Sequence, residues 1–215
     1  MTVDKNHSLV SIPADSLMLE GILEIPKGAK AIIIFVHGSG SSRLSPRNNF
    51  VAKVLRDAGL GTLLFDLLTK EEDFVYENRF DIPLLAKRLL SATQWVRKQP
   101  DTKKLKIGYF GASTGSAAAL IASTEAGNEI YAIVSRGGRP DMAEKVLDRV
   151  HSPTLLIVGG YDDVVIELNE QAYDLIKAEK ELRIIPGATH LFEEPGTLEE
   201  AARLAAGWFK KYLSQ

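Results

Sequence analysis

The sequence predicts a single α/β domain, in which a doubly wound and mostly parallel sheet follows an antiparallel hairpin at the amino terminus. Unbroken runs of β-branched and other apolar residues recur along the chain, and such runs are typical of strands covered on both faces. Helical patterns separate them from residue 31 onward, and this alternation places helices on both faces of a sheet. We therefore expect one three-layer domain over residues 1–215, whose 45% apolar content suffices for one sizeable core.

The expected strands follow in order along the chain. Residues 8–25 alternate loosely around a break at residues 13–16, as the two strands of a hairpin do, and the segment PKGAK then supplies a turn. The buried strands are expected at AIIIFV (31–36), TLLFD (62–66), KIGYFG (106–111), YAIVSRGG (131–138), TLLIVGG (154–160) and LRIIPG (182–187).

Apolar residues spaced three and four apart indicate the helices between these strands. Such spacing is found in residues 50–58, 85–96 and 165–176. A final helix is expected from Thr197 to Leu213, with its apolar side docked on the sheet. Asp141 with Glu144, and Thr197 with Glu200, fit capping boxes that would begin two helices.

Charge and composition exclude several classes of protein. The formal net charge is -2, and the basic residues are scattered among acidic ones, so we expect no basic surface that would bind nucleic acid. The absence of cysteine excludes disulfides, thiolate metal sites and a cysteine nucleophile. The longest apolar run, Ala31–Val36, is far too short to span a bilayer, and the amino terminus lacks the pattern of a secretion signal. We expect a cytoplasmic monomer or homodimer with no nucleic-acid or membrane partner.

The segment GASTG, residues 111–115, places Ser113 between two glycines where a strand ends and a helix begins. This is the context that the motif G-x-S-x-G needs to form a nucleophile elbow. A side chain at Gly111 or Gly115 is expected to clash, because the sharp turn brings strand and helix close together. The alternative is an ordinary glycine-rich turn. The context favours Ser113 as a nucleophile.

A serine nucleophile needs a histidine base and an acid that orients it, and in this fold both follow the serine. His190 lies in a loop after the last expected strand, where the base of such a triad belongs, whereas His151 precedes a buried strand and fits a surface turn. Two aspartates follow the preceding strand. We assign the orienting role to Asp162, and Asp163, at the start of a helix, stays as the alternative.

An oxyanion hole completes such a site, with one backbone N–H from the residue after the nucleophile and one from the loop after an early strand. These amides are expected at Thr114 and at Ser39, where Gly38 and Gly40 allow the loop to approach a substrate. His37 precedes the nucleophile and ends a buried strand, so we interpret it as structural, holding this loop by hydrogen bonds.

Taken together, the segments HGSG, GASTG, GGYDD and GATH resemble the α/β-hydrolase superfamily, and specifically its dienelactone-hydrolase-like branch of short enzymes with a minimal lid. The resemblance implies Ser113 as nucleophile, His190 as base, Asp162 as orienting acid, and Ser39 and Thr114 as oxyanion donors, with no cofactor and no metal. Dienelactone hydrolases proper use cysteine in the elbow, whereas this chain has serine. The resemblance therefore implies a serine hydrolase that cleaves a small-molecule carboxylic ester or a related acyl bond, without naming the acid or alcohol.

Substrate contacts are expected from the loops around the elbow, including the polar segment 67–80, which fits no regular element. Tyr76 and Tyr161 could line an apolar pocket, together with Phe74 and Phe80. Arg136 could receive a carboxylate or phosphate, since it follows a strand on the loop side of the sheet. Other arginines could do the same: Arg43, Arg47 and Arg139. The alternative is that the aromatic residues close the core and the arginines pair with surface acids.

A different class of function stays open. The same fold serves proteins that bind ligands without turnover, and a catalytically inactive ligand-binding or interaction protein is the alternative to a hydrolase. A nucleotide-binding interpretation of GYFGASTG is weaker, because the G-x-G-x-x-G spacing is missing and no acidic residue ends the next strand.

Overall fold

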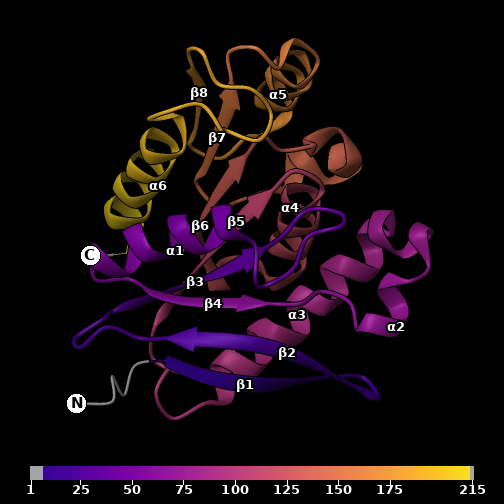
Figure 1. Cartoon of the computed structure of the whole chain (residues 1–215), viewed down its shortest axis with the longest axis vertical. Coiled ribbons are helices and arrows are strands. Elements are labelled where there is room, and N and C mark those ends of the chain that lie inside the picture. The colour runs from indigo at the N-terminus through magenta and orange to yellow at the C-terminus, as the bar shows by residue number, and fades with distance from the viewer. Residues whose placement is uncertain (1–6, 214–215) are drawn as a thin grey trace.

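In the computed structural model, which describes residues 7–213, the chain forms an eight-stranded sheet between layers of helices (Figure 1). The strands are β1 (His7–Ala14), β2 (Leu17–Glu24), β3 (Ala31–Val36), β4 (Gly61–Phe65), β5 (Lys106–Ala112), β6 (Ile130–Arg136), β7 (Thr154–Gly159) and β8 (Lys180–Ile185). Their order is β1-β2-β4-β3-β5-β6-β7-β8. β2 pairs antiparallel with β1 and β4, and all other pairs are parallel. The predicted sheet and hairpin are confirmed.

Helices cover both faces of this sheet. The α-helices are α1 (Pro46–Asp57), α2 (Lys70–Asp73), α3 (Ile82–Lys98), α4 (Thr114–Ala126), α5 (Asp163–Leu175) and α6 (Thr197–Leu213). The 3₁₀ helices are η1 (Tyr76–Phe80), η2 (Gly127–Glu129) and η3 (Pro140–Arg149). α1 and α6 lie together on one face, and α3 and α4 pack side by side on the other (Figure 1). This is the three-layer arrangement that the alternation of strand and helix predicts.

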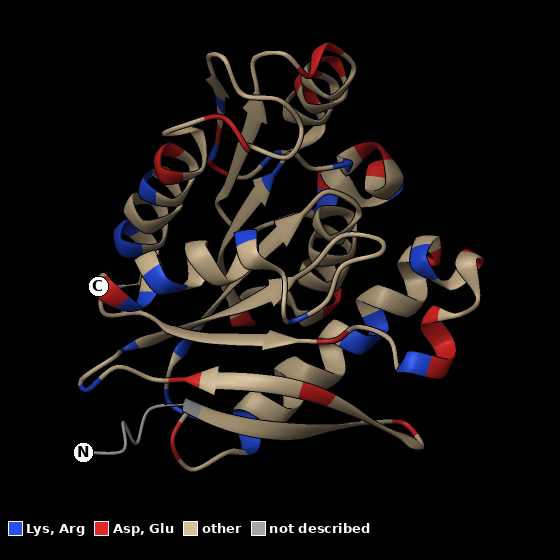
Figure 2. Cartoon of the chain, in the orientation of Figure 1, with Lys and Arg blue, Asp and Glu red and all other residues tan. Residues whose placement is uncertain are grey.

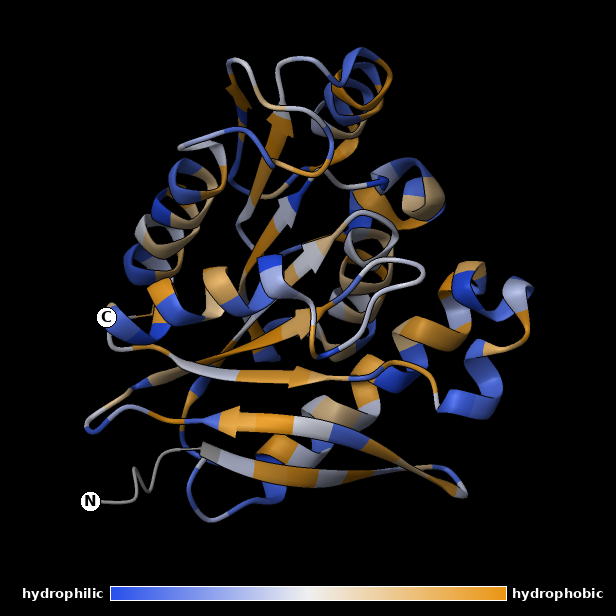
Figure 3. Cartoon of the chain, viewed as in Figure 1, coloured by the Kyte–Doolittle hydropathy of each residue, from blue (hydrophilic) through white to orange (hydrophobic). Residues whose placement is uncertain are grey.

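β3 shows why its sequence is an unbroken apolar run. Its six residues are all buried, and successive side chains point to opposite faces of the sheet. Ile32 and Ile34 join the core beneath α3 and α4, whereas Ile33 and Phe35 join the core beneath α1 and α6. Burying one such side chain stabilises the fold by about 1.5–3 kcal/mol. Figure 3 shows the same contrast, with largely hydrophobic strands between helices of mixed character.

Figure 2 shows acidic and basic residues mixed over the helices and loops of the face in view. Across residues 7–213, no helix has both the length and the apolar character that crossing a membrane requires.

The segment 67–80, which fits no predicted element, folds as α2 and η1. α2 has only four residues and begins with a capping box, in which Thr69 and Glu72 bind each other's backbone amides. Glu72 also accepts a hydrogen bond from the buried Arg88 of α3, whose guanidinium binds the Ala14 carbonyl of the hairpin as well. A single buried cation therefore ties this segment to the edge of the sheet.

Both predicted capping boxes are wrong. Residues 140–149 form a 3₁₀ helix, and the Asp141 carboxylate accepts two hydrogen bonds from the Arg139 guanidinium instead of capping amides. Thr197 is already the first residue of α6, and its hydroxyl donates to the Glu194 carbonyl. In each case a nearer polar partner satisfies the side chain that would have formed the cap.

The parallel strands bring their carboxyl ends, and the loops that follow them, to one edge of the sheet. The strand order reverses at β3, because β4 lies on one side of it and β5 on the other. Ligands in open α/β sheets bind at the carboxyl ends of the strands beside such a reversal. The loops after β3 and β5 meet at this point.

Candidate active site

Ser113 lies in a sharp turn between β5 and α4, with a backbone φ of 51° and ψ of -125°. A Cβ added at Gly115 would lie 2.1 Å from the Val36 carbonyl oxygen, and one at Gly111 would lie 2.5 Å from the Cα of Ser116. Neither distance is possible for a side chain, so the predicted need for both glycines is confirmed. The elbow forms because only glycine allows β5, α4 and the end of β3 to approach so closely.

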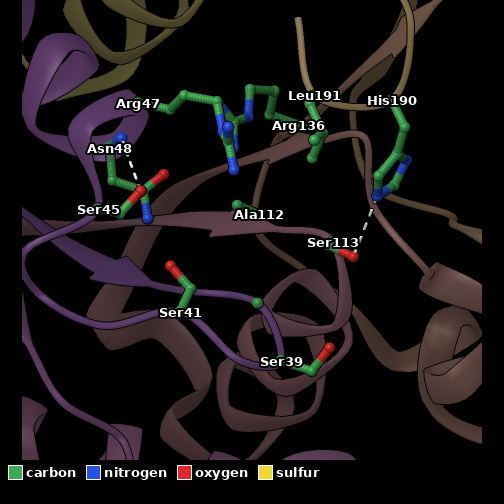
Figure 4. Close-up of a pocket in the computed structure, with 11 residues that line it drawn as sticks. Ser39, Ser41, Ser45, Arg47, Asn48, Ala112, Ser113, Arg136, His190 and Leu191 are labelled. Carbon is green, nitrogen blue, oxygen red and sulfur yellow. Dashed lines mark hydrogen bonds between the residues drawn. The ribbon is translucent and has the colours of Figure 1, made fainter.

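The elbow presents Ser113 to His190, and Asp162 lies behind His190. The Oγ of Ser113 is 3.4 Å from His190 Nε2, and His190 Nδ1 is 2.6 Å from Asp162 Oδ2 (Figure 4 draws the first contact). Because a carboxylate can only accept, Nδ1 carries the proton and Nε2 is left to accept from the serine hydroxyl. The geometry is that of a hydroxyl, an imidazole and a carboxylate in series.

The loops after β7 and β8 hold the two partners of Ser113. Asp162 follows β7 and precedes α5 without capping it, so its carboxylate is available to His190. Asp163 is the first residue of α5. His151 is exposed in the loop before β7, as a surface turn residue would be. The structure therefore brings together the three residues that the sequence selects, and leaves their two alternatives outside the series.

Ser39 and Thr114 lie together beside the elbow, but the amide of Ser39 is engaged. Its N–H donates to the Oγ1 of Thr114 over 2.9 Å. Thr114 opens α4, and the first amides of a helix have no acceptor within the helix. The Thr114 N–H therefore has no acceptor within α4, whereas the Ser39 N–H is already bound to the Thr114 hydroxyl.

His37 holds the loop after β3 in place. Its Nε2 accepts from the Leu67 N–H over 3.1 Å, so Nδ1 carries the proton and donates to the Gly38 carbonyl at 2.9 Å. Burial is the main cause that lowers the pKa of His37 below its usual value of 6.5, so the ring is neutral. The loop is also close-packed, since a Cβ at Gly38 would lie 3.0 Å from that of Ser113.

A cavity of about 260 Å³ opens beside Ser113 (Figure 4). The loop after β3 and the first turn of α1 line one side, through Ser41, Ser45, Arg47 and Asn48. Asn48 is buried. The Ser45 hydroxyl caps α1 by accepting a hydrogen bond from the backbone N–H of Asn48. Sequence reasoning missed Asn48, although the pair Ser45-Pro46 signals a helix start that would have placed it here.

Arg136, at the end of β6, also lines this cavity. Arg136 is only 7% exposed, and its guanidinium lies 5.6 Å from the centre of the Phe192 ring. Burial, with a smaller contribution from the charge of Arg47, lowers the pKa of Arg136 to about 10, so it is still a cation at neutral pH.

The other predicted substrate contacts are not in the cavity wall. Tyr76 and Tyr161 are 64% and 72% exposed and lie outside the residues that line it. Tyr76 sits on η1, where its ring packs on Phe80, and Tyr161 follows β7 with its side chain in solvent. Arg43 pairs with Asp66 and Glu20, and Arg139 pairs with Asp141. Hydrophobicity alone does not show which way a loop side chain points.

Within residues 7–213, no group of three or more histidine, aspartate or glutamate side chains is arranged to hold a metal ion.

A mostly parallel sheet, flanked by helices and with an elbow serine after its central strand, is the fold of the α/β-hydrolases. Within that class, residues 19–214 match the dienelactone hydrolase family, and the chain belongs to that family. The resemblance seen in the sequence is confirmed.

Two solved structures illustrate the likeness. A dienelactone hydrolase from Anabaena variabilis ATCC 29413 is 55% identical, with a TM-score of 0.94 over 96% of this chain and 98% of that chain. Est1E from Butyrivibrio proteoclasticus is 16% identical, with a TM-score of 0.83 over 96% of this chain and 99% of that chain, and is alike in fold alone. The family and the Anabaena structure support a hydrolase.

A curated relative carries a different name. A Mycobacterium tuberculosis (strain H37Rv) protein named "Putative phosphoribosyl transferase" is 54% identical over 204 residues, which are 95% of this chain and 46% of that protein. The present chain therefore spans about half the length of that relative.

Proposed function

We propose that this protein is a serine hydrolase that cleaves carboxylic esters, or a related acyl bond, through an acyl-enzyme on Ser113. The observation that carries the proposal is the hydrogen-bonded series from the Ser113 hydroxyl through His190 to Asp162, built on a strained elbow at the edge of the cavity. Family membership supports the hydrolase class, and the small cavity beside the hydroxyl supports a small substrate.

In the first half of the reaction, the Ser113 oxygen attacks the ester carbonyl carbon while its proton passes to His190 Nε2. Asp162 keeps the imidazole in the required tautomer and stabilises the imidazolium that forms. The negative charge on the former carbonyl oxygen is held by the Thr114 N–H and by the Ser39 N–H, once the latter leaves the Thr114 hydroxyl.

The intermediate then collapses, the carbon–oxygen bond to the alcohol breaks, and the alcohol takes the proton from His190. Water enters next, gives a proton to His190, and attacks the acyl-enzyme. The Ser113 oxygen leaves with that proton, and the acid is released. One water is consumed, and one acid and one alcohol form, so the cycle balances without any other reactant.

The direct test is the mass of the intact protein after incubation with a fluorophosphonate, followed by peptide mapping. We expect one adduct on Ser113 in the native protein, none in Ser113→Ala, and an unchanged adduct in Ser91→Ala, which removes a hydroxyl bound within α3. An ester panel on the same three proteins should show turnover that depends on Ser113. Native protein that neither forms an adduct nor cleaves any ester would refute the proposal and favour ligand binding without turnover.

A further inference from the structure

Arg136 is a buried cation without a counter-ion in the part of the chain that the structure describes. Its Nε and Nη1 atoms are buried and have no hydrogen-bond partner among residues 7–213, and no carboxylate pairs with it there. Leaving a buried charged donor unpaired is costly, and guanidinium groups inside proteins are normally paired. The nearby Phe192 ring can attract the cation, but a ring face cannot satisfy two in-plane N–H donors.

The rest of this wall has the same electrostatic character. Arg47 lines the cavity from the first turn of α1, and its positive charge repels that of Arg136. Arg47 pairs with Glu193, which lies outside the cavity wall. Among residues 7–213, the side chains that line the cavity include no acidic one. Arg136 is therefore the cation of this wall that has no carboxylate partner among residues 7–213, and an anion in the cavity would offset its repulsion with Arg47.

Two features of α1 bear on what the cavity can hold. α1 is twelve residues long, and its amino-terminal end faces the cavity through Ser45, Arg47 and Asn48. The amino terminus of a helix favours negative charge. The side chain of Asn48 is also buried, with its Oδ1 unpartnered among the residues described. An unpartnered amide oxygen and an unpartnered guanidinium in the wall of one cavity indicate a polar occupant. The amide oxygen can only accept a hydrogen bond, so Arg136, and not Asn48, is the group that suits an anion.

We propose that this wall is an oxyanion subsite, in which Arg136, assisted by Arg47, holds a carboxylate or phosphate group of the substrate. The subsite rests on the proposed ester hydrolysis, because it shares its cavity with Ser113. The guanidinium fork of Arg136 suits either anion, since both present two oxygens in the geometry that the fork matches.

The strand pairing places the backbone of Arg136 beside the elbow. Arg136 is the register partner of Ala112, and its carbonyl accepts the Ser113 amide over 3.1 Å. The cavity holds about 260 Å³, so the substrate is short, with only a few atoms between anion and ester carbonyl. Figure 4 shows the two arginines on one side of Ser113 and His190 on the other. The alcohol receives its proton from His190, so the anion belongs to the acyl part.

Matched esters test this subsite. Ethyl butanoate, monoethyl succinate and ethyl 3-phosphonopropanoate are short acyl esters that end in a methyl, a carboxylate and a phosphonate group. We expect kcat/KM in the native protein to be at least tenfold higher for one or both anionic esters than for ethyl butanoate, and the better of the two distinguishes carboxylate from phosphate. No preference for either anionic ester would overturn the proposal.

Variants assign that preference to residues. Arg136→Gln should reduce the ratio of anionic to neutral kcat/KM at least tenfold. Arg47→Gln, whose side chain is 36% exposed and less critical for folding, should reduce it several-fold. Arg203→Gln removes the same charge from the exposed face of α6 and should leave the ratio unchanged. An equal ratio in native protein and both cavity variants would overturn the assignment, even if Arg136→Gln folds poorly.

A binding measurement separates this proposal from the proposed function. Succinate and inorganic phosphate, compared with chloride at equal ionic strength, should raise the melting temperature of the native protein and Arg203→Gln but not of Arg136→Gln. If no ester is cleaved and this stabilisation is seen, the hydrolase proposal fails and the anion subsite stands. If esters are cleaved without anionic preference and neither anion stabilises the protein, only the subsite fails.

Discussion

Replacing Ser113 by glycine should make the protein more stable while removing its hydroxyl. The backbone angles of Ser113, φ 51° and ψ -125°, are those of the first central residue of a type II′ turn, a position that favours glycine. A non-glycine residue held in such a region costs about 1–3 kcal/mol. Ser113→Gly removes this strain, while the more flexible unfolded chain offsets about 0.5–1 kcal/mol of the gain.

The right reference for this prediction is Ser113→Ala, which also removes the hydroxyl but keeps the Cβ and therefore the strain. The hydroxyl itself contributes little to stability, because its contact with His190 is long at 3.4 Å. The expected net difference is that Ser113→Gly exceeds Ser113→Ala by roughly 0.5–2 kcal/mol in free energy of unfolding. For a chain of this size that corresponds to about 1–8 °C in melting temperature.

Urea unfolding of the two variants, followed by tryptophan fluorescence and by circular dichroism, measures this difference. The two probes should coincide, and the slope of free energy against urea should be the same in both variants. A Ser113→Gly variant that is no more stable than Ser113→Ala would show that the elbow stores no backbone strain, and the reasoning would be wrong.

Three further predictions follow from the contacts around the elbow. Because burial lowers the pKa of His37 from 6.5, acidification protonates the unfolded chain first, so the free energy of unfolding should fall below pH 6.5, by at most ~1.4 kcal/mol per pH unit. Urea titrations down to about pH 5, above the usual pKa range of carboxylates, should give a flatter dependence for His37→Gln. Gly115→Ala should lose about 3 kcal/mol because of the Val36 carbonyl, whereas Gly207→Ala, in open space on α6, should gain about 1 kcal/mol; equal melting temperatures would contradict this packing. Thr114→Val frees the Ser39 amide for the substrate and should raise kcat/KM for a neutral ester roughly 2- to 10-fold, and a fall would assign the hydroxyl a direct part in the reaction.

The fold could be predicted from the sequence wherever a short stretch of residues is enough to determine the local structure. The run at Ala31–Val36 is apolar throughout because both faces of β3 are buried, and the elbow glycines are needed by the geometry of a single turn. The segment 67–80 could not be assigned, because α2 is held by its cap and by Arg88 rather than by an apolar face of its own.

Some residues of the candidate site could likewise be predicted from the sequence, and others could not. Ser113, His190 and Asp162 could be selected because the chain order of the fold places each after a particular strand. Arg136 could be named as a cation from the sequence. That its Nε and Nη1 have no hydrogen-bond partner among residues 7–213 depends on the packing of every neighbouring element, which the sequence does not show. Tyr76 could be expected in the cavity for its chemistry, yet the direction of a loop side chain is set by packing that the sequence does not display.

The place of α6 in the chain has a consequence for synthesis. α6 packs on β5 and β6 and covers the buried side chains of β3 that face it, such as Ile33 and Phe35. A nascent chain that has left the ribosome only as far as β7 would carry the elbow serine without His190, and with this half of the sheet exposed to water. Such a chain would be prone to association until the last helix is made, and it would lack the histidine that the proposed hydrolysis needs.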